Sequence, residues 1–204
     1  GLFGAFSITS ALVGQLRQPP GGARGCEIDL SATEALLRML DPLAVEHQVQ
    51  GVVRERTGAR ANYSALSNIF QTRDHQYVTI VCTSYSTYQR IFAVMGHPEL
   101  VDDPRLATAA SRLEHGDMVD GLVTEWCRSL SLDDLVVQLS NAGVPHSKVN
   151  NIEDVLADPH FQARQALIEL PDPALGHVTA PGIVPRYSNY QLKTPRSGPG
   201  VGEH

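Results

Sequence analysis

The stretch QYVTIVC, residues 76–82, carries the strongest β-strand pattern in the sequence. β-branched and aromatic side chains favour strands because they pack well on a pleated surface. Four apolar residues then recur at the spacing of one helix face: Tyr88, Ile91, Phe92 and Met95. Gly96 and Pro98 end that pattern. A strand followed at once by an amphipathic helix predicts a mixed α/β region in the middle of the chain.

Further along the chain, a second apolar stripe predicts another helix; it consists of Val119, Leu122, Val123, Trp126, Cys127 and Leu130. A third helix is expected to begin after Ser131, whose side chain can cap it with Asp134 at the third helical position, and to end before Gly143. Residues 144–149 then read as a strand. Beyond Asn151 we expect a short helix that is interrupted at 158–159, then short extended pieces between prolines, and an exposed tail rich in Pro and Gly.

Before the central strand, residues 51–73 are polar and loop-like, which indicates a domain boundary. The chain opens with GLFGAFSITSALVGQLR, where sixteen uncharged residues precede Arg17. This run holds too many polar residues and glycines for a spanning helix, and it lacks the basic region and cleavage site of a signal peptide. Its apolar residues cover most of a helical wheel, so we expect a helix buried on nearly all sides and no membrane segment.

Turn chemistry follows in QPPGGARG, residues 18–25, which lacks the Lys-Ser/Thr pair of a phosphate-binding loop. Residues 26–30, CEIDL, alternate and predict a short strand. Ser31 to Glu34 match a capping box at the start of a helix, which Asp41 and Pro42 should break.

Composition and charge exclude several classes of protein. The net charge is −6, the basic residues are scattered arginines, and the lysines are Lys148 and Lys193, so nucleic acid is not an expected partner. The cysteines lie far apart without a CxxC pair, which argues against disulfides and a thiolate zinc site. We expect Cys26, Cys82 and Cys127 to be small buried hydrophobic residues in a reducing, cytoplasmic setting.

Candidate catalytic patterns are weak. The eight histidines form neither HxxxH nor HExxH, and we expect no metal. The adjacent pairs at 102–103 and 133–134 point their carboxylates apart, and helix capping explains them better than acid/base chemistry. No GxSxG or Cys/His nucleophile pattern is present in the sequence. The residues alone therefore indicate no active site.

The order of segments nevertheless resembles the C-terminal half of a family III CoA-transferase of the CaiB/BaiF group, over essentially all 204 residues. The segments that carry the resemblance are ALVGQLR (11–17), GGARG (21–25), CEIDL (26–30), SATEALL (31–37), QTRDHQYVTI (71–80), MGHPELVDDPRLATAASR (95–112), EWCRSLSLDDLVVQLSNAGVPHSKV (125–149), DPHF (158–161) and TPRSGPGVGEH (194–204). The most specific parts are HPEL with DDPR, AGVP and the closing GEH.

The resemblance implies an α/β fold: the end of a large Rossmann-like domain (1–50), a small α/β domain (51–150) and a C-terminal segment that returns to the large domain (151–204). It implies an enzyme that moves CoA between carboxylic acids through an aspartyl mixed anhydride and an aspartyl-CoA thioester. CoA thioesters would be substrates, no cofactor would be tightly bound, and the protein would form an interlocked homodimer. By the resemblance the nucleophilic aspartate falls two to four residues before Gly1, so this chain alone is expected to be inactive.

The resemblance also implies a flexible loop over the substrate, which corresponds here to TGARANYSAL, with Gly58, Ala61, Asn62 and Tyr63. An ordinary interdomain loop is the alternative. α-Methylacyl-CoA racemases share the fold, and some carry a glutamate where this sequence has Ser84, which favours a transferase. A non-catalytic subunit that pairs with a separate N-terminal chain is the third hypothesis. His75 stands where the family usually has Gly after Asp74, a change that affects local turn geometry.

Overall fold

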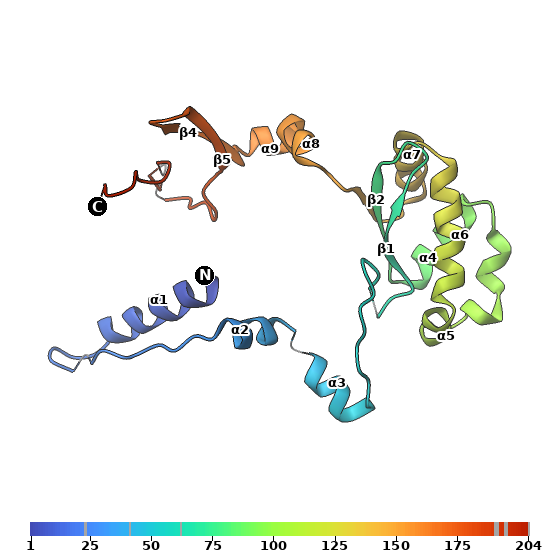
Figure 1. The fold of residues 1–204 in the computed structure, drawn as a ribbon. Coiled ribbons are helices and arrows are strands. Elements are labelled where there is room, and N and C mark those ends of the chain that lie inside the picture. Colours follow the sequence, from blue (N-terminus) through green and yellow to red (C-terminus); the bar gives the residue numbers. More distant parts are fainter. Residues whose placement is uncertain (23, 41, 62, 190–191, 194–195, 204) are drawn as a thin grey trace. The chain divides into compact units, whose positions relative to one another are not determined.

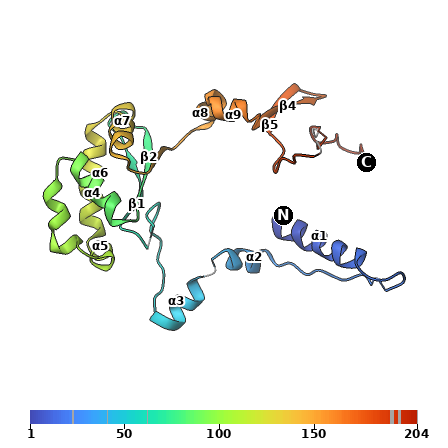
Figure 2. The same cartoon turned by 180° about the vertical axis from the view of Figure 1, so that it is seen from behind.

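A computed structural model describes residues 1–22, 24–40, 42–61, 63–189, 192–193 and 196–203. The chain divides into two compact units, Gly1–Arg56 and Thr57–His204. Figure 1 labels their helices and strands, and Figure 2 shows the same elements from behind. The division falls inside the stretch 51–73, and its assignment to large-domain and small-domain parts stays a prediction.

The first unit is helical in its described residues, with α1 (Leu2–Leu16), α2 (Ala32–Met39) and α3 (Pro42–Gln50). The Ser31 hydroxyl accepts a hydrogen bond from the Glu34 amide at 3.4 Å, so Ser31 caps α2 and half of the predicted capping box is confirmed. Asp41 lies outside the described residues. The strand predicted at 26–30 is wrong: these residues have no regular secondary structure, because the described part of this unit offers no second strand to pair with them.

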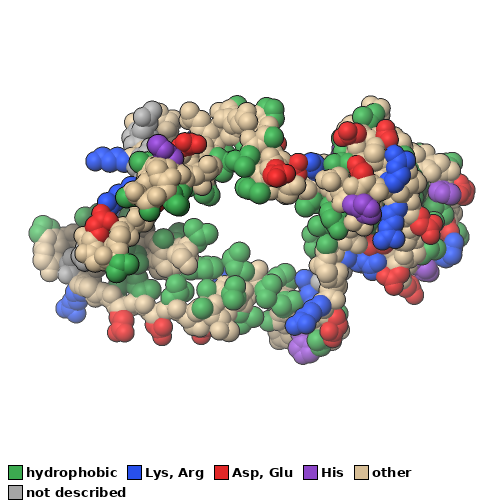
Figure 3. All heavy atoms as spheres, turned by 45° about the horizontal axis from the view of Figure 1, so that its top comes forward, with side chains coloured by type: hydrophobic (Ala, Val, Ile, Leu, Met, Phe, Trp, Pro, Cys, Tyr) green, Lys and Arg blue, Asp and Glu red, His purple; other side chains and the backbone are tan. Residues whose placement is uncertain are grey.

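α1 is a helix as predicted, but the expectation that it is buried on nearly all sides is wrong within this unit. No residue of α1 is buried, and Leu2 and Phe6 are 89% and 73% exposed. α2 and α3 likewise expose Leu36, Met39 and Val49. Figure 3 shows many hydrophobic side chains, coloured green, at the molecular surface. An apolar sequence favours burial, but it cannot supply the partner surface that buries it.

Residues 1–204 expressed alone are therefore expected to associate, because exposed apolar surface of this extent drives contact between molecules. Light scattering should give an apparent mass above that of the 22.1 kDa monomer. Replacing Leu2 and Phe6 together by serine should shift the population toward monomer, whereas Thr9→Ser on the same helix should not. A monodisperse monomer that binds no hydrophobic dye would contradict the prediction.

The second unit contains a three-stranded antiparallel sheet in the order β1 (Leu66–Gln71), β2 (Tyr77–Cys82) and β3 (His146–Lys148). Leu66 pairs with Cys82, and Val78 pairs with Lys148. The strand at 76–82 is confirmed, and the strand predicted at 144–149 is present in shorter form. Describing all of 51–73 as loop is wrong, because β1 lies within it.

Helices cover one face of this sheet, as Figure 1 shows. They are α4 (Tyr85–Val94), α6 (Gly116–Ser129) and α7 (Leu132–Ala142). The 3₁₀ turn η1 (Pro98–Asp102) packs on α4, and α5 (Ala109–Glu114) packs on α6 and on the 3₁₀ turn η2 (Pro104–Leu106). Their apolar residues and those of the sheet form one core, which includes Leu66, Val78, Ile80, Ile91, Phe92, Val119, Val123, Leu135 and Leu139. We call β1–β3 with α4–α7 the sheet module.

Caps define the ends of these helices, and those at Ser131 and Gly143 are the ones that the sequence predicts. Ser84 forms a capping box with Thr87 at the start of α4, and Ser131 accepts from the Asp134 amide at 3.2 Å. Gly143 ends α7 with a φ of 65°, a left-handed conformation that glycine adopts without a steric cost.

The remainder of the second unit holds α8 (Ile152–Ala157), α9 (Pro159–Ala163) and a hairpin of β4 (Leu167–Asp172) and β5 (Gly176–Pro181). The interruption predicted at 158–159 is confirmed, because Asp158 ends α8 and Pro159 begins α9. In the tail, Ser197 donates to the Pro171 carbonyl at 3.0 Å and Arg196 pairs with Glu203 at 2.6 Å.

Candidate functional site

The loop before β1 begins with a tight turn. The Arg60 amide donates to the Thr57 carbonyl at 3.3 Å, and the Thr57 hydroxyl donates to the Arg60 carbonyl at 2.9 Å. Gly58 lies in this turn with a φ of 66°, a region that residues with a Cβ rarely adopt. Glycine is therefore needed at this position for backbone geometry, whether or not the loop contacts a substrate.

The loop is then tied to the sheet. The Ala61 amide donates to the Ser67 carbonyl at 2.8 Å, and the Ser64 hydroxyl donates to the Cys82 carbonyl at 3.1 Å. Tyr63 between these ties is 74% exposed, so its ring is available for contact. Asn62 lies outside the described residues. The structure thus brings Gly58, Ala61 and Tyr63 onto one short loop, and their role in substrate binding stays a prediction.

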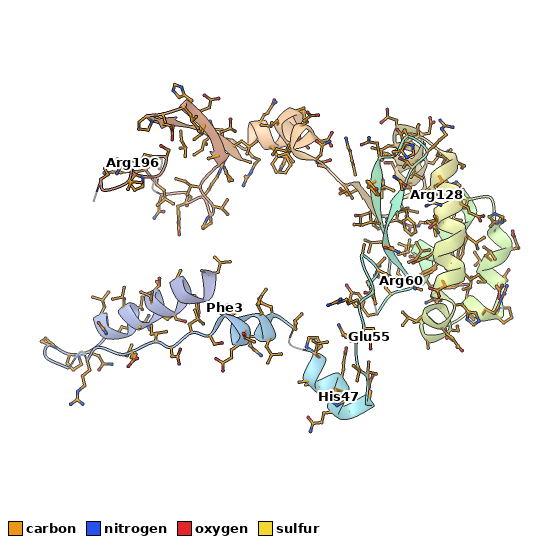
Figure 4. All side chains as sticks on the ribbon, viewed as in Figure 1. Phe3, His47, Glu55, Arg60, Arg128 and Arg196 are labelled. Atoms are coloured by element: carbon orange, nitrogen blue, oxygen red, sulfur yellow. The ribbon has the colours of Figure 1, made fainter. Side chains whose placement is uncertain are left out.

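Arg60 forms the strongest contacts of this loop. Its Nε donates to Asp120 Oδ2 at 2.7 Å and its Nη1 donates to Asp117 Oδ1 at 2.6 Å, both on α6. Asn68 on β1 also donates to Asp120 Oδ2, at 2.9 Å. Figure 4 labels Arg60 where the loop meets the sheet module. Hydrogen bonds between charged groups are about twice as strong as neutral ones.

Asp120 is buried, with 6% of its surface exposed, and its Oδ1 has no hydrogen-bond partner among the described residues. The hydrogen bond to Asp117 raises the pKa of Arg60 above its ordinary value, and the bond to Asp120 adds to this effect against the lowering effect of burial. Sequence reasoning missed this cluster. The apolar stripe of α6 was visible, but Asp120 beside Val119 gave no sign that its partner lay some sixty residues earlier.

Other candidates have structural roles. Hydrogen bonds from the Arg105 side chain, followed by the one from its backbone amide, lower the pKa of Asp103 to about 2. Asp74 accepts from the Leu132 amide at 3.2 Å, which ties the β1–β2 turn to the start of α7, and its pKa is lowered mainly by the Thr72 hydroxyl. His75 has a φ of 59°, the conformation that the usual glycine would adopt more easily.

Neither a metal site nor a membrane-spanning helix is present among the described residues. No group of three or more His, Cys, Asp or Glu side chains there could hold a metal ion. In that part of the chain, no helix has both the length and the apolar character needed to cross a membrane.

The three cysteines differ in environment. Cys82 and Cys127 are buried as predicted, but Cys26 is exposed, because the segment that holds it pairs with no other strand in the described part of its unit. Burial raises the pKa of the Cys82 and Cys127 thiols to about 12. Their thiolate, the reactive form, is therefore scarce in the folded protein at neutral pH.

We expect a thiol reagent at pH 8 to label Cys26 rapidly, and Cys82 and Cys127 at least about 100-fold more slowly until the sheet module unfolds. Mass spectrometry of the digested protein measures each rate. Cys26→Ser should remove the fast phase alone. Rapid native labelling of Cys127 would show that α6 is not packed on the sheet as described.

Comparison with known proteins gives a family and several relatives. The family described as CoA-transferase family III matches residues 1–204. The succinyl-CoA–D-citramalate CoA-transferase of Chloroflexus aurantiacus is 34% identical over 203 residues, which cover 100% of this chain and 50% of that protein. The alpha subunit of succinyl-CoA–L-malate CoA-transferase from the same species is 31% identical, over 98% of this chain and 46% of that subunit. A bile acid CoA-transferase of Clostridium scindens is 25% identical over 89% of this chain and 43% of that protein.

Solved structures agree on the fold. A CaiB/BaiF family protein from Brucella suis superposes with a TM-score of 0.78 at 27% identity, over 100% of this chain and 51% of that one. Rv3272 from Mycobacterium tuberculosis superposes with a TM-score of 0.74 at 20% identity, over 98% of this chain and 51% of that one. The chain spans about half the length of the relatives that it matches. The predicted α/β fold, matching a C-terminal portion, is confirmed.

Proposed function

The chain belongs to CoA-transferase family III, and from this premise we propose that it is the C-terminal portion of an enzyme that moves CoA between carboxylic acids. The observation that carries the proposal is the 34% identity with a CoA-transferase along 100% of the chain. Several relatives are named for succinyl-CoA, which makes succinyl-CoA the first donor to test. The acceptor is a second carboxylic acid, and CoA thioesters are substrates rather than bound cofactors.

In the proposed reaction an aspartate outside residues 1–204 attacks the thioester carbonyl of the donor. The C–S bond breaks, and the CoA thiolate leaves behind a mixed anhydride. The thiolate attacks the aspartyl carbonyl, which gives an aspartyl-CoA thioester and frees the donor acid. The acceptor carboxylate then attacks this thioester, which releases the CoA thiolate and forms a second mixed anhydride. The thiolate attacks the acceptor's carbonyl in this anhydride, which gives the new acyl-CoA and restores the aspartate.

The contribution proposed for this chain is the loop that holds Gly58, Ala61, Asn62 and Tyr63. Its described residues carry the exposed ring of Tyr63 and no carboxylate, imidazole or amine, which suits binding. The parent enzyme is proposed to be a cytoplasmic homodimer, in which the uncovered apolar side chains of α1–α3 are buried. This chain alone is proposed to be inactive.

Ser84 supports transfer over racemisation. Its hydroxyl accepts from the Thr87 amide at 3.3 Å as the cap of α4, and a hydroxyl there offers no base for an α-proton. The names of two relatives as alpha and beta subunits keep the hypothesis of a separate partner chain open to test.

The experiment is transfer by the full-length protein that contains residues 1–204. With succinyl-CoA and D-citramalate or L-malate, chromatography should show a new acyl-CoA and free succinate in equal amounts. Residues 1–204 alone serve as the inactive control. Deuterium incorporation at the α-carbon of a branched acyl-CoA without CoA exchange would replace the proposal by a racemase. Activity that appears only with a separate partner chain would favour a subunit.

A further inference from the structure

We propose that Arg60 is a positioning residue, which clamps the loop of Gly58, Ala61 and Tyr63 to α6 and so holds it as a fixed wall of the acyl-CoA site rather than a moving lid. This inference rests on the proposed function, because it assumes that the loop contacts substrate.

The loop is fastened on both sides of Arg60. Before it lies the Thr57–Arg60 turn, with two hydrogen bonds between the same pair of residues. Directly after Arg60, the Ala61 amide donates to the Ser67 carbonyl at 2.8 Å. A lid that opens must break such bonds, whereas a wall keeps them.

The clamp reaches into the core of the sheet module. Asp120 Oδ2 accepts a hydrogen bond from Arg60 Nε, and Asn68 on β1 donates to the same oxygen. Asp120 follows the fully buried Val119 on α6. One buried carboxylate thus joins the loop, the edge strand and a core helix. Asp117 adds a second contact from the solvent side, with a side chain that is 95% exposed.

Burial makes the clamp selective for Arg60. Asp120 Oδ1 has no partner among the described residues, so this carboxylate depends on the two donors at Oδ2. The planar guanidinium reaches Asp117 and Asp120 at once from fixed positions, which a lysine ammonium cannot reproduce. A preorganised loop loses less conformational freedom when substrate binds. Loss of the clamp should therefore raise the KM for acyl-CoA.

The test uses the full-length enzyme with Arg60→Met, Arg60→Lys and Asp117→Asn. Hydrogen exchange of residues 57–65 should become about ten-fold faster in Arg60→Met, and KM for acyl-CoA should rise about ten-fold while kcat stays within about two-fold. Arg60→Lys should be intermediate. Asp117→Asn, which weakens the exposed contact and keeps the buried pair with Asp120, is expected to fold and should give a smaller rise in both quantities. Arg105→Met, which breaks the exposed pair with Asp103 on the same module, is the matched control and should change neither.

The outcomes separate the two proposals. If the wild-type enzyme transfers CoA but exchange in 57–65 is the same in Arg60→Met and Asp117→Asn as in wild type, the clamp is wrong. Faster exchange with an unchanged KM also overturns the inference, because the loop then lies away from substrate. If the wild-type enzyme transfers no CoA, the proposed function fails, while the exchange data still report whether Arg60 holds the loop.

Discussion

Phe92→Ala is expected to lower the free energy of unfolding of the sheet module by about 3–5 kcal/mol. Phe92 is 1% exposed, and its ring lies 6.0 Å from that of Tyr88, centroid to centroid. Removing the ring takes away buried apolar area and leaves a cavity that the surrounding strands and helices fill only in part. For a domain of ordinary stability, about 5–15 kcal/mol, this is a large fraction.

Urea denaturation measures the effect. Trp126 is the single tryptophan of the chain, and it packs against the core from α6, so its fluorescence reports unfolding of this module. Tyr85→Ala is the matched control, since it removes a large aromatic side chain that is 47% exposed from the same helix. Its cost should be below about 0.5 kcal/mol. Equal losses in the two variants would show that α4 does not pack on the sheet through Phe92.

Much of the sheet module could be predicted because its signals are local. The capping residue Ser131, the glycine at 143 and the apolar stripes each report on a few neighbouring residues, and each agrees with the structure. The sequence did not predict β1 because polar Ser67 and Asn68 break its apolar pattern, and the side-chain partner of Asn68, Asp120, lies 52 residues away in sequence. A strand of this kind is defined by pairing, which the sequence alone does not display.

Burial of α1 and pairing of 26–30 failed for a related reason. Both need a second surface, and a pattern of apolar residues states the need without identifying the partner. The Arg60 cluster was even harder to predict from the sequence. Its members Arg60, Asp117 and Asp120 are each ordinary surface residues by type, and only the fold brings the loop against α6. Charged partners distant in sequence leave no periodic signal.

Loss of Arg60 should also cost stability in a way that depends on Asp120. Arg60→Met leaves a buried carboxylate with the Asn68 amide as its remaining described donor. Breaking a fully buried ion pair from one side costs about 3–5 kcal/mol. Because the Arg60 side chain is 31% exposed and water can partly replace it, we expect about 2–3 kcal/mol here.

A double-mutant cycle isolates this pair. In an Asp120→Asn background no charge is stranded, so the same Arg60→Met substitution should cost about 1 kcal/mol or less, and the difference gives a coupling of about 1–2 kcal/mol. Asp117→Asn, on the exposed arm, should cost less than about 1 kcal/mol by itself. Urea denaturation followed through Trp126 measures all four corners of the cycle. If Arg60→Met costs the same with and without the Asp120 carboxylate, the pair adds no coupling, and the loop is held by its backbone hydrogen bonds to Thr57 and Ser67 instead.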